Sequence, residues 1–386
     1  MPNARKRAHV NQRPRGNTYR SPSPQKIGAD ENKSRAAKGM LFIIAVVGIY
    51  VLYLVISGQM GTFLDSMHHV STPWIIGAII CYCLYYVAGV SSYAVAVWLD
   101  HDSPVGIRDL MSVEASGAFF GNLTPAQIGS APAQILRLTN AGLDAGEATG
   151  TQLTRALMLQ IASVTYSLIV LLIGFISFRA IYGNLIFLAL VAWVIGFLMI
   201  FAQIAVCVFP NQVMKFGNAA VKTLSKRGWL KNYSTAYNFV NNEVGELSAA
   251  FQRATQSHQG LFVTLVIDFI QLTLLYMIPW FIANAFGCDI NPIVSLELCA
   301  LVQMVGAAVP LPGGTGGVDL AWNIFFGPTF GSLTMAGFIM WRFIAYIGPI
   351  FLAIPFLNLH SHSTQSLYQR WNDITHGVKS KESPFK

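Results

Sequence analysis

Six charged residues lie inside otherwise apolar stretches of this 386-residue chain: Glu114, Arg155, Asp268, Glu297, Asp319 and Arg342. A charge at the centre of a bilayer costs at least a few kcal/mol unless it is paired or hydrated, so each of these residues marks a candidate functional position. A planar guanidinium can hold a phosphate through paired N–H donors, and the two arginines therefore predict phosphate binding. The alternative is that each arginine pairs with a carboxylate or with backbone carbonyls, and the two interpretations can coexist.

The carboxylates in these stretches are the candidates for coupling to an ion. Asp319 follows a glycine-rich turn and has two interpretations, a proton or cation site or the partner of an arginine, of which we favour the pairing. Asp268 and Glu114 are the other two candidates for ion coupling.

The glycine-rich turn itself runs through Pro312, Gly313, Gly314 and Gly316. Free backbone N–H groups near a helix start attract anions, which suggests a phosphate loop. No Lys-Ser/Thr pair follows the glycines, so the segment is not a nucleotide-binding P-loop. We expect the glycines mainly to allow a tight turn and close helix approach, with anion contact as a second role.

The residue patterns of other chemistries are missing from the sequence. There is no Ser/His/Asp or Cys/His constellation, and the adjacent His68 and His69 suit a solvated loop better than a metal site or a pH sensor. The five cysteines lack metal-ligand spacing and are expected to be packing residues. We therefore expect no catalytic residue, no metal, no cofactor and no enzymatic activity. The cysteines are Cys81, Cys83, Cys207, Cys288 and Cys299.

Composition identifies the environment of these residues as a membrane. Hydrophobic residues make up 54% of the chain and charged residues 11%, with a mean hydropathy of +0.50. A soluble domain has about 25% charged residues, and a membrane helix needs about 20 apolar residues. Six apolar runs are long enough to span: 40–57, 73–98, 152–178, 184–208, 260–285 and 333–357.

Two further apolar stretches, 109–138 and 293–326, are interrupted by Pro and Gly at Leu123-Thr124-Pro125 and at 310–314. A helix does not run through such breaks, so both stretches are predicted to be re-entrant hairpins. The sequence thus predicts an all-α polytopic membrane protein of about six transmembrane helices and two re-entrant helical hairpins.

Basic residues fix the predicted orientation. The N-terminal tail, the 209–258 loop and the C-terminal tail hold most of the lysines and arginines, which places all three in the cytoplasm. The predicted domains are a disordered basic tail at 1–38, a transmembrane domain at 39–358 and a cytoplasmic tail at 359–386. Within the loop, Val213, Phe216, Ala220 and Leu224 have helical spacing opposite Lys215, Lys222 and Lys226, which predicts an interfacial amphipathic helix or a helix packed on the cytoplasmic end of the bundle.

An internal repeat relates the two halves. A shift of the chain by 187 residues brings Pro125 onto Pro312, Gly129 onto Gly316, Gly150 onto Gly337 and Arg155 onto Arg342. The units 73–178 and 260–357 have opposite predicted orientations, so the repeat is inverted. Inverted repeats with broken helices are typical of transporters, in which the substrate site lies near the bilayer midplane.

Two motifs resemble a known family. The first runs from Asn122-Leu123-Thr124-Pro125 through Gly129 to Gln134. The second is Pro310-x-Pro312-Gly313-Gly314-x-Gly316-x-x-Asp319, with Trp341-Arg342 and Pro349 downstream. Together they resemble the flippase-like membrane family related to the transmembrane region of lysylphosphatidylglycerol synthases. This chain departs from the family pattern at Gly129-Ser130-Ala131-Pro132, where Gly-Gly-Gln-Pro is frequent, and at Asp319, where Glu is usual.

The resemblance implies a bacterial or archaeal plasma-membrane protein that moves an anionic or aminoacylated phospholipid, or a polyprenyl-linked lipid, between leaflets. It also implies that the soluble aminoacyl-transferase domain is absent, because too few residues follow the last span. The alternatives are a non-transporting membrane scaffold and an integral-membrane lipid transferase. We expect no nucleic-acid partner, and a homo-oligomer stays open. The candidate substrate-binding residues are Arg155, Arg342, Pro125, Gly129, Gln134, Pro312, Gly313, Gly314, Gly316 and Asp319.

Overall fold

The computed structural model describes residues 70–99, 103–124, 127–183, 186–226, 258–308 and 317–361, together with scattered positions between 232 and 248. Chain contacts divide the molecule into two compact units, 1–58 and 59–386, and every described residue belongs to the second unit. The predicted first span at 40–57, the basic tail and most of the C-terminal tail therefore lie outside the described residues.

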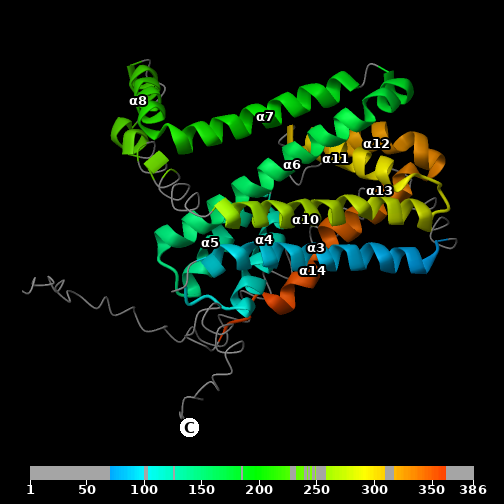
Figure 1. Cartoon of the computed structure of the whole chain (residues 1–386), viewed down its shortest axis with the longest axis horizontal. Coiled ribbons are helices and arrows are strands. Elements are labelled where there is room, and N and C mark those ends of the chain that lie inside the picture. Colours follow the sequence, from blue (N-terminus) through cyan, green and yellow to red (C-terminus); the bar gives the residue numbers. More distant parts are fainter. Residues whose placement is uncertain are drawn as a thin grey trace, which may run out of the picture. The chain divides into compact units, whose positions relative to one another are not determined.

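The described part of the chain is built from helices joined by short connections (Figure 1). In chain order they are α3 (Thr72–Leu99), α4 (Ile107–Leu123), α5 (Ser130–Asn140), α6 (Ala145–Tyr182), α7 (Ile186–Val208), α8 (Pro210–Lys226), α10 (His258–Ala285), α11 (Pro292–Ala308), α12 (Gly317–Phe330), α13 (Thr334–Arg342) and α14 (Gly348–Ala353). The prediction of an all-α protein is confirmed for the described residues.

Four described helical segments are long and apolar enough to cross a membrane: Thr72–Trp98, Ala145–Phe175, His258–Ala285 and Gly317–Phe356. A fifth is obtained if the bent pair Leu190–Val206 and Pro210–Lys226 counts as one span. Five of the six predicted spans thus fall on helices. The last one, predicted at 333–357, starts within one residue of α13 at Thr334, and a 3-10 turn at Gly331–Leu333 joins it to α12, so that the whole apolar helical segment begins at Gly317.

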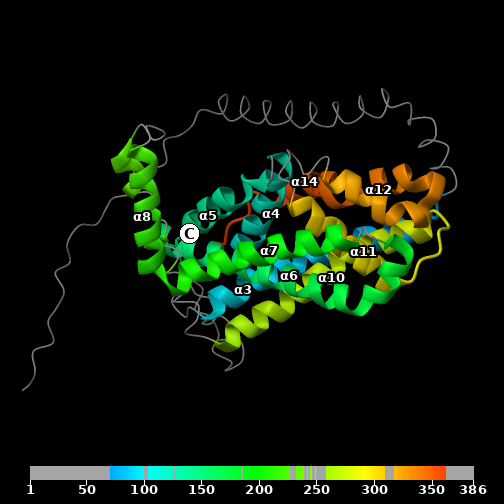
Figure 2. The ribbon, with the colours of Figure 1, turned by 90° about the horizontal axis from the view of Figure 1, so that it is seen from above.

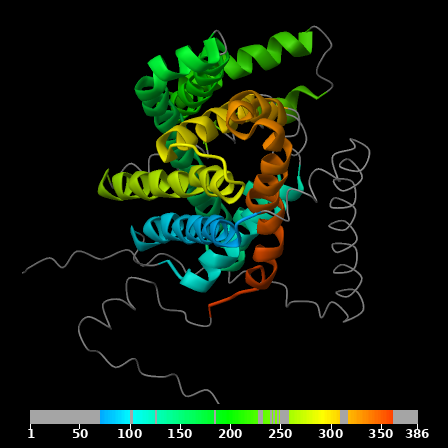
Figure 3. The same ribbon diagram turned by 90° about the vertical axis from the view of Figure 1, so that its right-hand side faces the viewer.

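The central feature is the pairing of α3 with α10, which lie side by side in two perpendicular views (Figures 1 and 3). The two helices are antiparallel. The Ser71 amide at the start of α3 donates to the Ala285 carbonyl at the end of α10 (2.9 Å), whereas Ser92 near the end of α3 donates to Asp268 in the first half of α10 (2.9 Å). The pair therefore stays in contact along almost its whole length.

The first interrupted stretch forms a helical hairpin. The α4 helix ends at Leu123, where the predicted break begins, and α5 starts at Ser130. Gly117 lies opposite Gln134 and Gly121 opposite Ser130, so the two helices are antiparallel. The Gly129 amide donates to the Thr124 hydroxyl (2.8 Å), which satisfies one of the free N–H groups at the start of α5.

The second interrupted stretch has the same outline. The α11 helix ends at Ala308 and packs against α12, which begins at Gly317. Residues 309–316, and with them Pro312, Gly313, Gly314 and Gly316, lie outside the described residues. Beyond α13, residues Phe343–Ile347 form a π-helical turn directly after Arg342. Such turns are frequent at functional sites.

The helix predicted in the 209–258 loop is present as α8, which meets α7 at 106° (Figure 2). The burial of its residues matches the predicted apolar face only in part. Val221 is the buried residue of α8, Val213 and Leu224 are half-buried, and Phe216 is 76% exposed beside the exposed Lys215. Phe216 therefore does not belong to the packed face.

Candidate functional site

Arg155 of α6 lies at the centre of a buried polar cluster that joins four helices. Its Nη2 donates to Gln271 Oε1 of α10 (3.2 Å) and lies 3.6 Å from Glu114 Oε1 of α4. Its Cζ lies 5.0 Å from the ring centroid of Tyr93 of α3, which is a cation–π contact. The expected alternative, that this arginine pairs with a carboxylate, is therefore confirmed.

Asp268 of α10 adds a second carboxylate to this cluster. Its Oδ1 accepts a hydrogen bond from Ser92 Oγ (2.9 Å), and the residue has 0% exposed surface. Gln271 is equally buried, and Glu114 and Arg155 are 7% and 8% exposed. Four polar atoms of these residues have no hydrogen-bond partner among the described residues: Glu114 Oε2, Arg155 Nε, Asp268 Oδ2 and Gln271 Nε2. Buried polar atoms are normally paired, so these four mark the cluster as a candidate binding site.

A chain of amides extends the cluster toward the α4–α5 hairpin. The Tyr93 hydroxyl bonds to Gln152 Oε1 in a short contact, and Gln152 Nε2 donates to Gln134 Oε1 (2.6 Å). Gln134, a predicted site residue, is buried against Gly117, where a Cβ would collide with its amide. The hairpin is thus connected to Arg155 through side-chain hydrogen bonds and an aromatic ring.

Glycine at position 89 allows the cluster to form. A Cβ built on Gly89 would overlap the Glu114 carboxylate and lie 2.8 Å from Gln271 Nε2. Only a residue without a side chain lets α3 approach this closely.

Arg342 occupies a second cluster with different surroundings. Its Nη2 donates to Asp319 Oδ1 (2.9 Å), which confirms the favoured pairing of Asp319 with an arginine. The guanidinium Cζ lies 4.5 Å from the Tyr346 ring centroid and 5.3 Å from that of Phe338. Nearby, Trp341 stacks on Trp322 with centroids 4.8 Å apart. This arginine is therefore enclosed mainly by aromatic rings.

The structure brings together some predicted residues and separates others. Glu114, Arg155 and Gln134 belong to one network of contacts, and Asp268 interacts electrostatically with Arg155 and Glu114. Asp319 and Arg342 form the other cluster. Gly129 caps the start of α5 and contacts Thr124 rather than a charged group. Pro125 and the glycines of 312–316 lie outside the described residues.

Sequence reasoning missed the uncharged members of the Arg155 cluster, which are Ser92, Tyr93, Gln152 and Gln271. Glutamine inside an apolar segment was the available signal, since a buried amide also needs partners. Among the described residues there is no group of three or more His, Cys, Asp or Glu side chains that could hold a metal ion.

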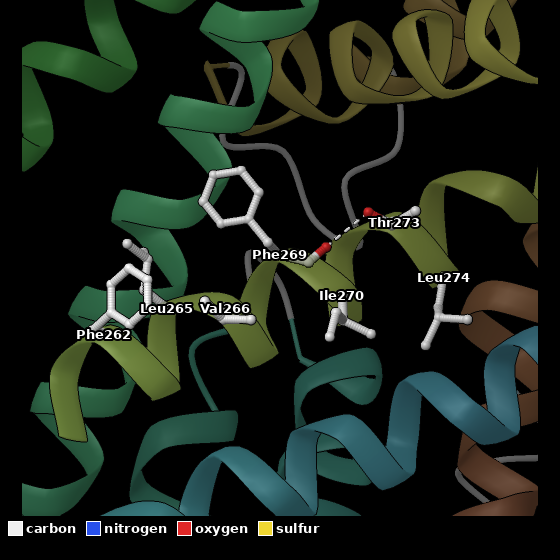
Figure 4. Close-up of a pocket in the computed structure, with 7 residues that line it drawn as sticks. All are labelled: Phe262, Leu265, Val266, Phe269, Ile270, Thr273 and Leu274. Carbon is white, nitrogen blue, oxygen red and sulfur yellow. Dashed lines mark hydrogen bonds between the residues drawn. The ribbon is translucent and has the colours of Figure 1, made fainter. Parts of the chain in front are cut away.

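The opposite side of α10 is apolar. A shallow hollow of about 490 Å³ is lined by seven residues between Phe262 and Leu274, all of them from α10 (Figure 4). Phe262 and Ile270 are among the well-exposed apolar side chains of this stripe, while Asp268 and Gln271 are fully buried on the other side. An apolar exterior over a polar interior is the distribution expected of a helix that faces lipid.

These features define a multi-pass membrane protein with ionisable side chains in its interior. The α7 helix supports this class, because large apolar side chains such as Phe187, Leu198 and Phe201 are more than half exposed. The chain belongs to the family described as the lysylphosphatidylglycerol synthase transmembrane region, whose model matches residues 40–353. Membership indicates a lipid-related function in the membrane. A search of curated proteins found no match.

Proposed function

We propose that the protein moves a phospholipid with a charged headgroup between the leaflets of the plasma membrane, and that the Arg155 cluster binds this headgroup. The observation that carries the proposal is the set of four unpartnered polar atoms around Arg155. Arg155 Nε and Gln271 Nε2 are donors, which suits a phosphate. Glu114 Oε2 and Asp268 Oδ2 are acceptors, which suits an ammonium group.

A headgroup that contains both a phosphate and an ammonium group complements this set best. An aminoacylated phospholipid is such a lipid, and its chemistry agrees with the family. An anionic phospholipid or a polyprenyl-linked lipid would use only the donors and would leave Glu114 Oε2 and Asp268 Oδ2 without a partner. Phosphatidylethanolamine has an ammonium group but no net charge, whereas lysylphosphatidylglycerol has a net positive charge. Two carboxylates against one guanidinium therefore favour the aminoacylated lipid.

The architecture supports transport through an inverted repeat. A shift of 187 residues carries α3 onto α10 to within one residue at each end, and these two helices run antiparallel. Their followers, α4 and α11, have 17 residues each. The helix contacts repeat as well. The α4 helix packs on α3, α5 and α14. The α11 helix packs on the corresponding helices of the other half, which are α10 for α3, α12 for α5 and α6 for α14. Two halves related in this way can exchange conformations to open the site to either leaflet.

In this proposal the two hairpins α4–α5 and α11–α12 are re-entrant, and the N- and C-termini are cytoplasmic. The lipid headgroup enters beside the hairpins while the acyl chains stay in the bilayer. Arg342 then stabilises the second half and supports the movement of its hairpin, since Asp319 belongs to α12 and Arg342 to α13.

The test is headgroup exchange in proteoliposomes that contain the full chain. Fluorescent phosphatidylglycerol, phosphatidylethanolamine and lysylphosphatidylglycerol are each followed between leaflets. We expect lysylphosphatidylglycerol to move fastest. Arg155→Lys keeps the charge but loses the planar fork, and it should slow exchange about tenfold or more, since a hydrogen bond to a charged group contributes about 1.5–3 kcal/mol.

Arg137→Lys is the matched control, because Arg137 lies in the last turn of α5 outside the cluster and its replacement should leave exchange unchanged. Equal rates for the three headgroups, or unaltered exchange in Arg155→Lys, would contradict the headgroup site. No exchange with any headgroup would favour the scaffold, and turnover of the headgroup by purified protein would favour the transferase.

A further inference from the structure

The charges in the Arg155 cluster do not balance. Glu114 and Asp268 contribute two carboxylates, and Arg155 contributes one guanidinium. All three side chains are more than nine-tenths buried. A net negative charge on buried side chains is costly, so the cluster needs one additional positive charge.

Asp268 is the carboxylate without an ion pair among the described residues. Glu114 lies within ion-pair distance of Arg155, at 3.6 Å, whereas Asp268 has only the hydroxyl of Ser92 on Oδ1. Its second oxygen, Oδ2, is buried and has no partner among the described residues. We propose that Asp268 carries a proton on Oδ2 while the site is empty, and that this proton is exchangeable with water.

A proton fits this position better than a metal cation. A metal ion needs several oxygen ligands, and the described residues contain no group of three or more acidic, His or Cys side chains that could hold one. A proton needs only the one oxygen atom that is without a partner. Uptake converts the carboxylate to a neutral carboxylic acid, and the remaining charges of Glu114 and Arg155 then cancel.

The charged groups around Asp268 determine how strongly its carboxylate binds the proton. Tyr85 and Tyr93 of α3, Glu114 of α4 and Arg155 of α6 are the titratable groups with which Asp268 interacts. Tyrosines are neutral near neutral pH, so the balance is between Glu114 and Arg155. The same neighbouring helices also carry these ionisable groups: Tyr166 of α6, Glu297 and Cys299 of α11, and Arg342 of α13.

The consequence for transport rests on the proposed function. A lysylphosphatidylglycerol headgroup carries two ammonium groups and one phosphate, so it brings the missing positive charge, and Asp268 releases its proton to water as this lipid binds. Proton release and lipid binding would then be linked.

The proton can be measured without any lipid substrate, by infrared difference spectroscopy of the full chain in detergent as pH is changed. A protonated buried carboxyl gives a carbonyl band that shifts on deuteration. We expect the wild type to show this band at mildly acidic pH and to lose it as the pH rises. Asp268→Asn, which mimics the neutral acid, should lack the band. Glu114→Gln should lose the band at a lower pH than the wild type, because Asp268 becomes the sole counterion of Arg155.

Asp319→Asn is the matched control and should keep the band, since its carboxylate pairs with Arg342. If the wild type shows no carbonyl band that disappears in Asp268→Asn, the proposal is wrong. A band whose midpoint moves when NaCl replaces choline chloride at equal ionic strength would also overturn it, in favour of a bound cation. Because no lipid is present, failure here is distinct from failure of the headgroup-exchange assay. If Asp268→Asn does not fold, the Glu114→Gln spectrum decides alone.

Discussion

Arg155 and Arg342 occupy positions related by the 187-residue shift, yet their surroundings differ. Arg155 shares a buried site with two carboxylates and an amide, and its Nε has no partner among the described residues. Arg342 pairs with Asp319, whose side chain is 35% exposed, and lies against three aromatic rings. A repeated arginine therefore does not imply a repeated function. The Arg155 cluster, which draws on both halves, contains four polar atoms without a partner among the described residues and an unbalanced charge, whereas Arg342 and Asp319 form an ion pair beside aromatic rings.

The largest expected effect comes from removal of the two guanidiniums. Arg155→Gln leaves Glu114 and Asp268 without the cation of their cluster, and loss of one partner from a buried ion pair costs about 3–5 kcal/mol. Arg342→Gln should cost less, because the Asp319 side chain is 35% exposed and the pair is less buried. The melting temperature of each purified variant in detergent checks this difference.

The double variant Arg155→Gln/Glu114→Gln sharpens this comparison. It restores the charge balance if Asp268 is protonated, so it should recover part of the stability that Arg155→Gln loses. Equal destabilisation by Arg155→Gln and Arg342→Gln would contradict the distinction between a charged site and a packed ion pair.

A smaller effect is expected from a methyl group at the contact between α3 and the cluster. Gly89→Ala places a Cβ against the Glu114 carboxylate and the Gln271 amide, and overpacking of this kind costs about 1–3 kcal/mol. The displacement should also slow lipid exchange. Gly146→Ala is the control, because its Cβ meets nothing within 4 Å and alanine favours a helix. A Gly89→Ala variant as stable and as active as wild type would show that α3 leaves room for a methyl group beside Glu114 and Gln271.

Most of the helical framework could be predicted from the sequence. The runs 73–98, 184–208 and 260–285 differ from α3, α7 and α10 by at most two residues at either end, because bilayer-length apolar runs have few alternatives to a helix. The break at Leu123-Thr124-Pro125 was equally clear. The start of the last span at Thr334 was also predicted to within one residue, but not its continuity with α12, because Gly331 adopts a positive φ of 54° and the short 3-10 turn still keeps the chain helical.

The site was less predictable than the framework. Charge in an apolar run identified Arg155, Glu114 and Asp268 individually, but their meeting depends on how α4, α6 and α10 pack, which a single sequence does not encode locally. The amides of Gln152 and Gln271 gave no signal in a search for charges. The burial of α8 was hard to predict for a related reason, because helical spacing cannot say whether Phe216 or Val221 faces the protein.

The smallest effect is expected when the hydroxyl group is removed from Tyr93, beside Arg155, or from Tyr346, beside Arg342. Tyr93→Phe keeps the ring under Arg155 but leaves Gln152, which is 4% exposed, without one hydrogen bond, at a cost of about 1–3 kcal/mol. Tyr346→Phe keeps the ring beside Arg342 and removes the bond to Gln303 (3.1 Å), whose side chain is only half-buried and can bond to water instead. Melting temperatures should therefore fall more for Tyr93→Phe.

Only Tyr93→Phe should also slow lipid exchange, because Gln152 links the Arg155 cluster to Gln134 of the α4–α5 hairpin. If both variants lower stability equally and leave exchange intact, the amide chain is packing and the hairpin is not coupled to the site through it.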